Sequence, residues 1–282
     1  MRPVILVLSV IFFQISGVFG QNHQVIQPGG QTFFALGMVD KIPSVELGEL
    51  RVLNIYLPNG YSPDSSKTYP VIYLLDGSDD EDFIHIAGIV QFLNMIQAMP
   101  ESIVVGIANV DRRRDFTFPT SIEKDKKAYP TTGSSVRFIS FIEKELQPYI
   151  QNKYKANNIK TIIGQSLGGL LATEILLKKP FLFDNYIIVS PSLWWNNESL
   201  LKAAPGLLNK SSVGNKQVII SVGAEGKEMD DDARKLSDIL RSTGTVSLKF
   251  LYLSKENHLT ILHNSVYQSF ELLYPKKSDH SK

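Results

Sequence analysis

A serine in the middle of the chain lies in the segment GQSLG, residues 164–168, which matches the pattern G-x-S-x-G. A serine hydroxyl is a weak nucleophile until a nearby base removes its proton. The two glycines suit a sharp, strained turn in which a strand and a helix come too close for a Cβ atom. The pattern therefore predicts a nucleophile elbow with Ser166 at its tip and the Leu167 N–H directed at a developing oxyanion. The alternative is an ordinary turn between a strand and a helix.

Such a serine needs a general base, and His258 is the best of the five histidines because it follows a predicted strand. Of the other four, one lies near each terminus, one on an early helix and one inside the last helix: His23, His280, His85 and His263.

The third group expected at such a site is an acid that holds the histidine in one tautomer. Glu225 is the first choice because it comes two residues after the glycine that ends a predicted strand. Three aspartates are alternatives, although they also suit the cap and acidic first turn of the next helix: Asp230, Asp231 and Asp232. The chain order Ser, acid, His is that of α/β-hydrolases.

The elements that must position these groups alternate after residue 70. Apolar, β-branched runs predict strands at residues 70–75, 103–107, 159–163, 186–189, 217–222 and 246–253. Helices are expected at residues 82–98, 133–150, 167–177, 198–208, 230–241 and 259–274. Residues 31–58 are expected to form two antiparallel edge strands. The predicted fold class is α/β, an α/β-hydrolase fold with a mainly parallel central sheet and helices on both faces.

In a parallel sheet, ligands bind beyond the carboxyl ends of the strands. The serine, the acid and the histidine all follow strands, so they are expected at this one edge. The loop after residues 70–75 reaches the same edge, and the N–H of Gly77 or Ser78 is expected there as the second oxyanion donor.

Two more groups at this edge suggest substrate binding. Trp194 and Trp195 follow a strand and suit an aromatic wall, although one of them could belong to the core. Arg112 and Arg114 lie in another loop at this edge and could hold a carboxylate or phenolate oxygen. The alternative is that Arg114 pairs with the neighbouring Asp115 and only holds the loop in place.

The first 20 residues predict a secretory signal peptide. Arg2 precedes an apolar run, and small residues lead up to cleavage between Gly20 and Gln21. The alternative is an uncleaved membrane anchor, but the apolar run is short and Gln14 interrupts it. The sequence thus predicts a secreted or periplasmic protein with one domain over residues 21–282 and no stable membrane anchor.

Charge and cysteine content exclude several classes of site. Of the 29 basic residues only Arg2 lies in the first 20, which leaves 28 against 28 acidic residues. This balance does not favour nucleic acid or an anionic membrane as a partner. The absence of cysteine excludes disulfides, thiolate metal sites and a cysteine nucleophile. No metal-ligand spacing is present, and no metal or cofactor is expected.

Four segments, YPVIYLLDG, IANVDRRRDFTFPT, GQSLGG and SPSLWWNNESL, resemble the putative-esterase family of α/β-hydrolases, which includes enterochelin and salmochelin esterases and esterase D type enzymes. The similarity covers nearly the whole chain after about residue 44. It implies a Ser–His pair at Ser166 and His258. In some siderophore esterases the acid is weak or absent, which leaves Glu225 the least supported member. Gln165 departs from the family, where histidine is common.

The resemblance also concerns His85, since similar proteins carry a histidine there. His85 is expected to line the acyl pocket or, alternatively, to make a local hydrogen bond on a helix face. The whole pattern predicts a secreted serine esterase that forms an acyl-enzyme, with a catecholate siderophore or related aromatic ester as the favoured substrate. The alternatives are a feruloyl or acetyl esterase acting on plant polysaccharide, a non-catalytic binding module, and acyl transfer to a carbohydrate. The expected partner is thus a small-molecule or carbohydrate-linked ester.

Overall fold

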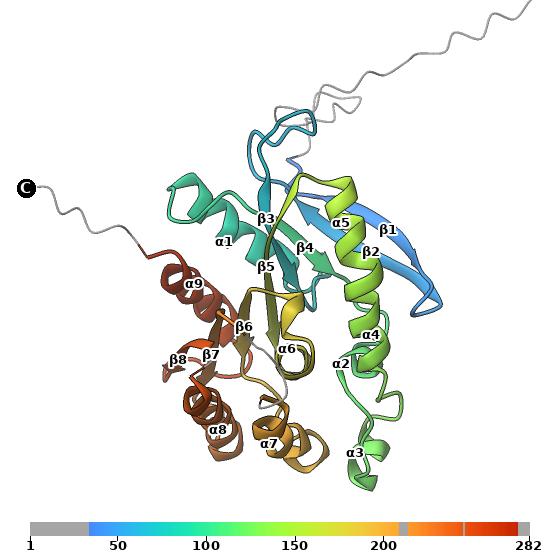
Figure 1. Ribbon diagram of the computed structural model, residues 1–282, viewed down its shortest axis with the longest axis vertical. Coiled ribbons are helices and arrows are strands. Elements are labelled where there is room, and N and C mark those ends of the chain that lie inside the picture. Colours follow the sequence, from blue (N-terminus) through green and yellow to red (C-terminus); the bar gives the residue numbers. More distant parts are fainter. Residues whose placement is uncertain (1–33, 209–213, 245, 276–282) are drawn as a thin grey trace, which may run out of the picture.

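The computed structural model describes residues 34–208, 214–244 and 246–275. Within these ranges the strands form one sheet in the order β1-β2-β4-β3-β5-β6-β7-β8 (Figure 1). The strands are β1 (Met38–Ser44), β2 (Glu49–Tyr56), β3 (Tyr69–Leu74), β4 (Ile103–Ile107), β5 (Ala156–Gln165), β6 (Asn185–Val189), β7 (Lys216–Gly223) and β8 (Val246–Leu253). β2 runs antiparallel to β1 and β4, and every other neighbouring pair is parallel.

The predicted mainly parallel sheet with antiparallel N-terminal strands is therefore confirmed. β1 forms the edge of the sheet, and β2 lies between β1 and β4. The buried residues of β3 explain its place near the centre, since all six of its side chains are shielded from solvent. A strand buried on both faces must have a neighbour on each side and helices above and below it.

Helices cover both faces of the sheet (Figure 1). On one face lie α1 (Phe83–Met95) and α9 (Ile261–Leu273). The other face is covered by α4 (Ser135–Phe141), α5 (Gln147–Lys153), α6 (Leu167–Lys178), α7 (Trp195–Leu208) and α8 (Lys227–Thr243). A π-helical turn, Ile142–Leu146, joins α4 to α5, so the predicted helix over residues 133–150 is one continuous helical stretch with a change of pitch.

Two α-helices among the described residues were not expected from the sequence. The segment predicted as a loop after β4 contains α2 (Arg112–Phe116), where the Asp111 carboxylate caps the first turn by accepting the Arg114 N–H. α3 (Glu123–Ala128) follows it. The aspartate cap predicted for α8 is also wrong. α8 begins earlier, at Lys227, after Gly226 turns the chain with φ of 97°.

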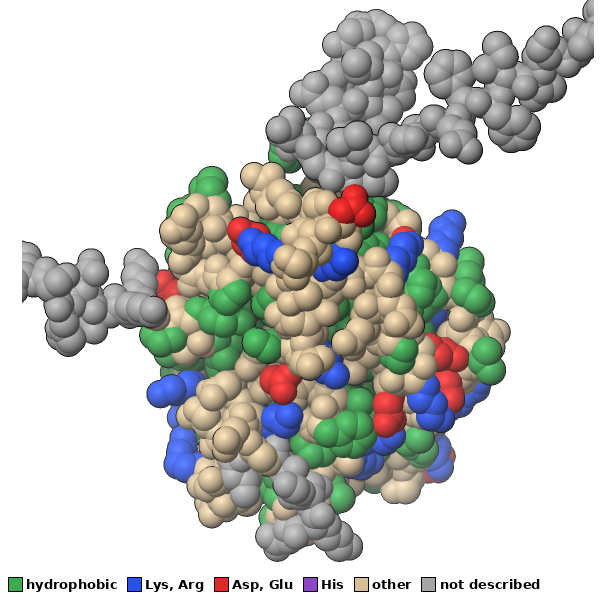
Figure 2. Space-filling view, turned by 45° about the horizontal axis from the view of Figure 1, so that its top comes forward, with side chains coloured by type: hydrophobic (Ala, Val, Ile, Leu, Met, Phe, Trp, Pro, Cys, Tyr) green, Lys and Arg blue, Asp and Glu red, His purple; other side chains and the backbone are tan. Residues whose placement is uncertain are grey.

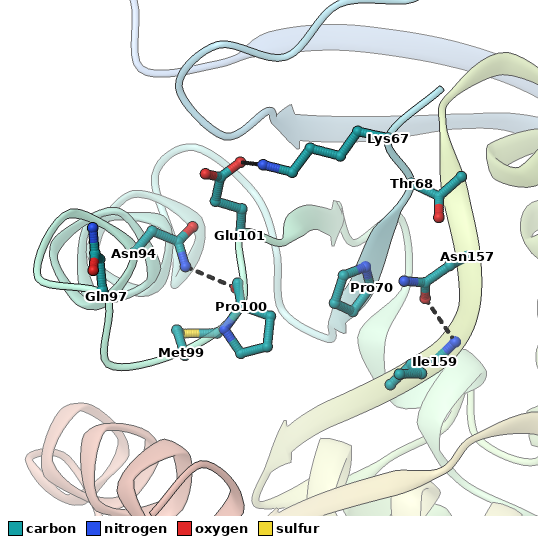
Figure 3. A pocket seen from close by; sticks show the side chains of 10 residues that line it. All are labelled: Lys67, Thr68, Pro70, Asn94, Gln97, Met99, Pro100, Glu101, Asn157 and Ile159. Atoms are coloured by element: carbon teal, nitrogen blue, oxygen red, sulfur yellow. Dashed lines mark hydrogen bonds and ion pairs between the residues drawn. The ribbon is translucent and has the colours of Figure 1, made fainter. Parts of the chain in front are cut away.

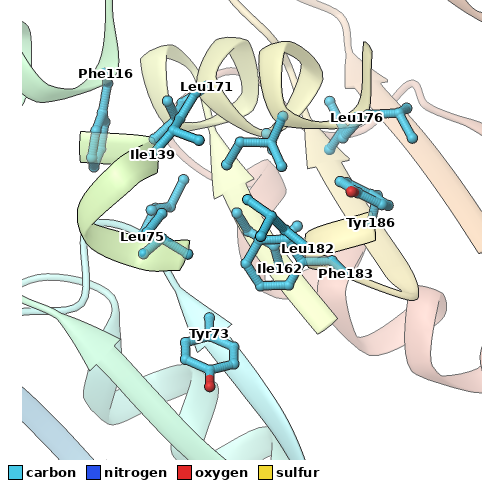
Figure 4. Packing of buried hydrophobic residues seen from close by; sticks show 14 of the residues in the cluster. Tyr73, Leu75, Phe116, Ile139, Ile162, Leu171, Leu176, Leu182, Phe183 and Tyr186 are labelled. Atoms are coloured by element: carbon cyan, nitrogen blue, oxygen red, sulfur yellow. The ribbon is translucent and has the colours of Figure 1, made fainter. Parts of the chain in front are cut away.

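The core beneath α6 holds the centre of the molecule rigid. Side chains of β3, β5 and β6, among them Tyr73, Ile162 and Tyr186, pack against Leu171 and Leu176 of this helix (Figure 4). Every residue of α6 from Leu167 to Leu177 is buried, whereas the sequence predicted a single apolar side. A helix that is packed on all sides cannot shift easily, because any displacement would open a void in the core.

The surface agrees with the balanced composition. On the face shown in Figure 2, basic and acidic side chains are interspersed and neither sign collects in one area. No helix in the described part of the chain is long and apolar enough to cross a membrane. The predicted signal peptide, residues 1–20, lies outside the described residues.

Candidate active site

Ser166 sits at the sharp turn between β5 and α6. Its backbone is left-handed, with φ of 59° and ψ of −118°. A Cβ on Gly164 would come within 2.4 Å of the Gly168 carbonyl oxygen, so a larger residue cannot fit there. A strained serine between closely packed backbones is the arrangement that the sequence predicted for a nucleophile elbow.

The elbow opens into a pocket of about 250 Å³ at the carboxyl edge of the sheet. It is lined by Ser166, Ser192, Trp194, Glu225, Met229 and His258. These residues follow β5, β6, β7 and β8, or lie at the start of the helix after β7. The parallel strands thus bring the predicted serine, acid and histidine to one cavity, although Ser166 and His258 are 92 positions apart in the sequence.

Glu225 and His258 are joined by a short hydrogen bond. The distance from His258 Nδ1 to Glu225 Oε2 is 2.6 Å, and the Glu225 side chain is only 2% exposed. The other carboxylate oxygen accepts bonds from Ser190 Oγ (2.5 Å) and from the Gly223 N–H (3.0 Å). Burial acts to raise the pKa of Glu225, but these three donors outweigh it and hold the pKa below its ordinary value.

Nδ1 of His258 is therefore occupied, and Nε2 is left as the ring nitrogen that can take up a proton. The Ser166 hydroxyl lies 3.2 Å from Ser192 Oγ, and the described side chains show no hydrogen bond between Ser166 and His258. In ligand-free structures, catalytic hydrogen bonds are often long and tighten only when substrate binds.

The two expected oxyanion donors differ in how they are engaged. Leu167 is the first residue of α6, where an N–H has no acceptor within the helix. Gly77 is wrong as a donor, because its N–H already donates to the Ile107 carbonyl at 3.0 Å. The Ser78 N–H has only a 3.4 Å contact with Glu81 Oε2. Ser78 is therefore the member of the predicted pair that remains available.

Arg112 does not extend into the pocket, which corrects its assignment to substrate binding. Its Nε and Nη2 atoms fork onto the two carboxylate oxygens of Asp76 at 2.5 and 2.9 Å. Nη2 also reaches the Gln165 carbonyl at 3.3 Å. The pairing is favourable because a buried carboxylate is stabilised by a neighbouring positive charge.

Arg114 is also wrong as a substrate ligand, and the alternative that it holds its own loop is correct. It donates to Asp115 at 2.7 Å and to both carboxylate oxygens of Glu49 on β2 at 2.6 and 3.0 Å. Asp115 in turn accepts from Arg51 at 2.8 Å, and both of these side chains are fully buried. The network fastens α2 to β2.

The two tryptophans have different roles. Trp195 is fully buried and its Nε1 donates to the Phe118 carbonyl at 2.9 Å, so its assignment to substrate binding is wrong. Trp194 lines the pocket as predicted and packs against Tyr129, with 6.3 Å between ring centroids. The guanidinium of Arg113 lies 4.9 Å from the centre of the Tyr129 ring.

His85 makes local contacts instead of lining the pocket. Its Nε2 lies 3.2 Å from Asp82 Oδ1 on the preceding turn, and its ring stacks on His263 of α9 at 5.8 Å. The alternative interpretation of a helix-face histidine is therefore correct. The three rival aspartates also point elsewhere, since each has a lysine or arginine partner on its own helix α8: Asp230, Asp231 and Asp232.

Sequence reasoning missed four residues. Ser192 and Met229 line the pocket, Ser190 holds Glu225, and the Gln165 side chain donates to the His258 carbonyl at 2.5 Å. The segment Ser-Pro-Ser directly after β6 was a usable signal, because hydroxyls at the carboxyl edge can reach the site. Gln165 was noticed only as a departure from a family pattern.

A larger pocket of about 480 Å³ lies at the other end of the sheet (Figure 3). It opens between the amino ends of β3, β4 and β5, and the ion pair of Lys67 with Glu101 crosses it at 2.5 Å. This position is opposite to the edge where parallel sheets bind ligands. Among the described residues, no three His, Cys, Asp or Glu side chains are grouped so that they could hold a metal ion.

Comparisons with known proteins agree on one family. The family model described as "Putative esterase" matches residues 44–259. Ferri-bacillibactin esterase BesA of Bacillus subtilis is 32% identical over 242 residues, 76% of this chain and 82% of the relative. An IroE-like serine hydrolase from Shewanella oneidensis has a TM-score of 0.77 and 31% identity over 84% of this chain and 80% of that structure. The structure of the BES protein from Bacillus cereus has a TM-score of 0.75 and 30% identity, and the match covers 86% of this chain and 98% of that structure.

Proposed function

The chain belongs to this esterase family of α/β-hydrolases, which supports hydrolase activity on esters, and we propose that it acts as a serine esterase with Ser166 as its nucleophile. One observation carries the proposal. A serine on a strained elbow, a histidine and a buried carboxylate, which come from three separate strand ends, line the same small pocket. The three groups match the nucleophile, the general base and the acid that orients the base in acyl transfer by a serine enzyme.

The proposed reaction begins when His258 Nε2 takes the proton from Ser166 as its Oγ attacks the ester carbonyl. Glu225 holds the ring by its Nδ1–H and stabilises the imidazolium that forms. The N–H groups of Leu167 and Ser78 receive the oxyanion. His258 then protonates the leaving alcohol, and a water that it activates releases the acid from the acyl-enzyme.

For the substrate, we propose a catecholate siderophore or a related aromatic ester. The relatives include an esterase named for ferri-bacillibactin and another named for enterobactin. In this chain the aromatic wall of Trp194 and Tyr129 suits a flat ring, and the exposed Arg113 beside it is not paired with any carboxylate in the described part of the chain. A positive charge next to an aromatic wall favours an anionic aryl group such as a catecholate.

The site is tested by Ser166→Ala. We expect hydrolysis of enterobactin and of a simple aryl ester to fall by about 10⁴-fold or more, because the nucleophile is removed. Ester hydrolysis is followed by chromatography and by release of a chromogenic alcohol. The wild type is also assayed on methyl ferulate and acetylated xylan. If it hydrolyses either of these faster than enterobactin, that ester becomes the proposed substrate in place of the siderophore.

Ser242→Ala is the matched control, since this hydroxyl donates to the Ile239 carbonyl on the exposed surface of α8 and lies outside the pocket. A fluorophosphonate probe should label the wild type and this control at Ser166 and leave Ser166→Ala unlabelled. An unlabelled wild type would instead favour a non-catalytic binding module.

We also propose export from the cytoplasm, with residues 1–20 as a cleaved signal peptide. Arg2, the apolar run and the small residues before Gln21 support this.

A further inference from the structure

Two charged residues beside the elbow remain unused by the mechanism, Asp76 and Arg112. Asp76 lies in the loop after β3, two residues before Ser78. Its carboxylate is 10% exposed and is enclosed by donors: both oxygens accept from the Arg112 fork, and one also accepts Asn109 Nδ2 at 2.7 Å. A pair that is built this closely defines geometry as well as charge.

The same arginine reaches across to the nucleophile side. Arg112 Nη2 donates to the Gln165 carbonyl, and the Gln165 side chain donates to the His258 carbonyl. A continuous hydrogen-bonded path therefore runs from the proposed oxyanion loop, through Arg112, to the residue before the nucleophile and on to the loop of the proposed base.

The loop at Asp76 depends on such external support. Asp76 has a left-handed backbone with φ of 54°, which costs free energy for a residue other than glycine. The next residue is clamped too, because a Cβ on Gly77 would lie 2.4 Å from Gly106, and its carbonyl accepts Asn54 Nδ2 at 2.8 Å. Through Arg112, the Asp76 carboxylate connects this strained loop to Gln165, the residue before the nucleophile elbow.

On the premise of the proposed function, we propose that Asp76 and Arg112 act as one positioning pair that sets the Ser78 N–H relative to the nucleophile elbow. Neither residue contacts substrate. The pair acts through the distance between the oxyanion donors and Ser166 Oγ. Its loss therefore affects the transition state and leaves binding of the ground-state ester nearly unchanged.

The test is a double-mutant cycle with Asp76→Asn, Arg112→Met and both together. Asparagine keeps the shape and tolerates the left-handed backbone, and methionine keeps most of the arginine's length. Each single variant should lower kcat for p-nitrophenyl butyrate and the fluorophosphonate labelling rate by about 10²-fold, because a small displacement of a donor is costly. KM should change by less than about threefold.

The double variant should lose no more than the worse single variant, since both changes break the same unit. Arg241→Met, an exposed arginine on α8, is the control for loss of a positive charge and should match the wild type. Melting temperatures show which variants are folded. If Arg112→Met does not fold, Arg112→Lys replaces it, because lysine keeps the charge but cannot form the fork, and it should also lower kcat.

A raised KM with unchanged kcat in Arg112→Met would overturn the proposal and restore Arg112 as a substrate ligand. Additive losses in the double variant would overturn it too. If the probe labels the wild type and Asp76→Asn at the same rate, only the positioning role is contradicted. If the probe does not label the wild type, the proposed function is contradicted, and the positioning role is contradicted with it.

Discussion

At the scale of single residues, the neighbours of a carboxylate decide what it can do. Glu225 is buried and keeps a lowered pKa because three donors surround it. Asp76 is buried too, and there burial raises the pKa even though Arg112 and Asn109 oppose the rise. Asp230 lies in the same stretch of sequence as Glu225, but it bonds to Arg234 on the surface of α8. Of these three carboxylates, Glu225 is the one that contacts His258.

Glu225→Gln tests that role. Glutamine keeps the size and can still contact Nδ1 of His258, but it carries no negative charge and can favour the wrong tautomer. We expect kcat to fall by about 10²–10⁴-fold at neutral pH, by analogy with the known effect of amide substitution in a serine–histidine–aspartate triad. Steady-state kinetics with an aryl ester measure this loss of kcat.

Asp230→Asn is the control, because it removes an acid five residues away that has no contact with His258. It should keep the wild-type kcat. The opposite result, a loss in Asp230→Asn with an active Glu225→Gln, would make the aspartate the third member of the site.

At the scale of elements, a buried acid connects the first strand to a helix. Asp40 of β1 accepts bonds from Lys153 (2.7 Å), Tyr154 (2.7 Å) and Tyr149 (3.0 Å), which lie on α5 or directly after it. β1 is the edge of the sheet and has only β2 as a neighbour. These bonds compensate for its missing second neighbour, since an edge strand alone is held by one ladder.

Asp40→Asn should therefore destabilise the fold in a pH-dependent way. Burial acts to raise the pKa of Asp40, but the three donors hold it below the ordinary value of 3.8. Its stabilisation is then fully present above pH 3.8 and is lost as the pH falls through the lower, folded-state pKa. At pH 7 we expect a loss of roughly 1–3 kcal/mol in the free energy of unfolding.

Urea unfolding at pH 7 and at steps down to pH 3 measures the difference between the two proteins. The difference should shrink at the acid end. Asp64→Asn, in the exposed loop between β2 and β3, is the control and should match the wild type throughout. An equal loss for Asp40→Asn at every pH would show that its charge is not involved.

At the scale of the whole molecule, one sheet separates two hydrophobic cores. Alternate residues of the same strand face opposite cores, as Ile72 and Tyr73 of β3 do. Both cores pack against the same strands. Unfolding of one core would therefore expose strands that also support the other. We therefore propose that residues 21–282 form a single cooperative domain.

The prediction is that a protein consisting of residues 21–282 unfolds in one transition. Far-ultraviolet circular dichroism follows helices on both faces, whereas tryptophan fluorescence follows only the core beside Trp194 and Trp195. Their guanidinium midpoints should coincide. Separate midpoints would show that the α1 and α9 side unfolds on its own.

How much the sequence revealed depended on the range of each interaction. The elbow, the alternating strands and helices, and the order of serine, acid and histidine were all predictable, because they come from glycine geometry and from runs of β-branched residues along short stretches. The parallel sheet then follows from the alternation, and it brings the strand ends to one edge. These local rules were enough to predict that Ser166 and His258 lie at one edge of the sheet, where both line the same pocket.

Only the tertiary structure decided which polar groups were already engaged. Arg114 pairs with Glu49 across 65 positions, Arg112 with Asp76 across 36, and the Gly77 N–H donates to Ile107. It also assigned Trp195 to the core and Trp194 to the pocket. The physical reason is that a side chain or an N–H is available for chemistry only if no distant partner reaches it first. Such partners are set by the packing of elements, which a single sequence does not show.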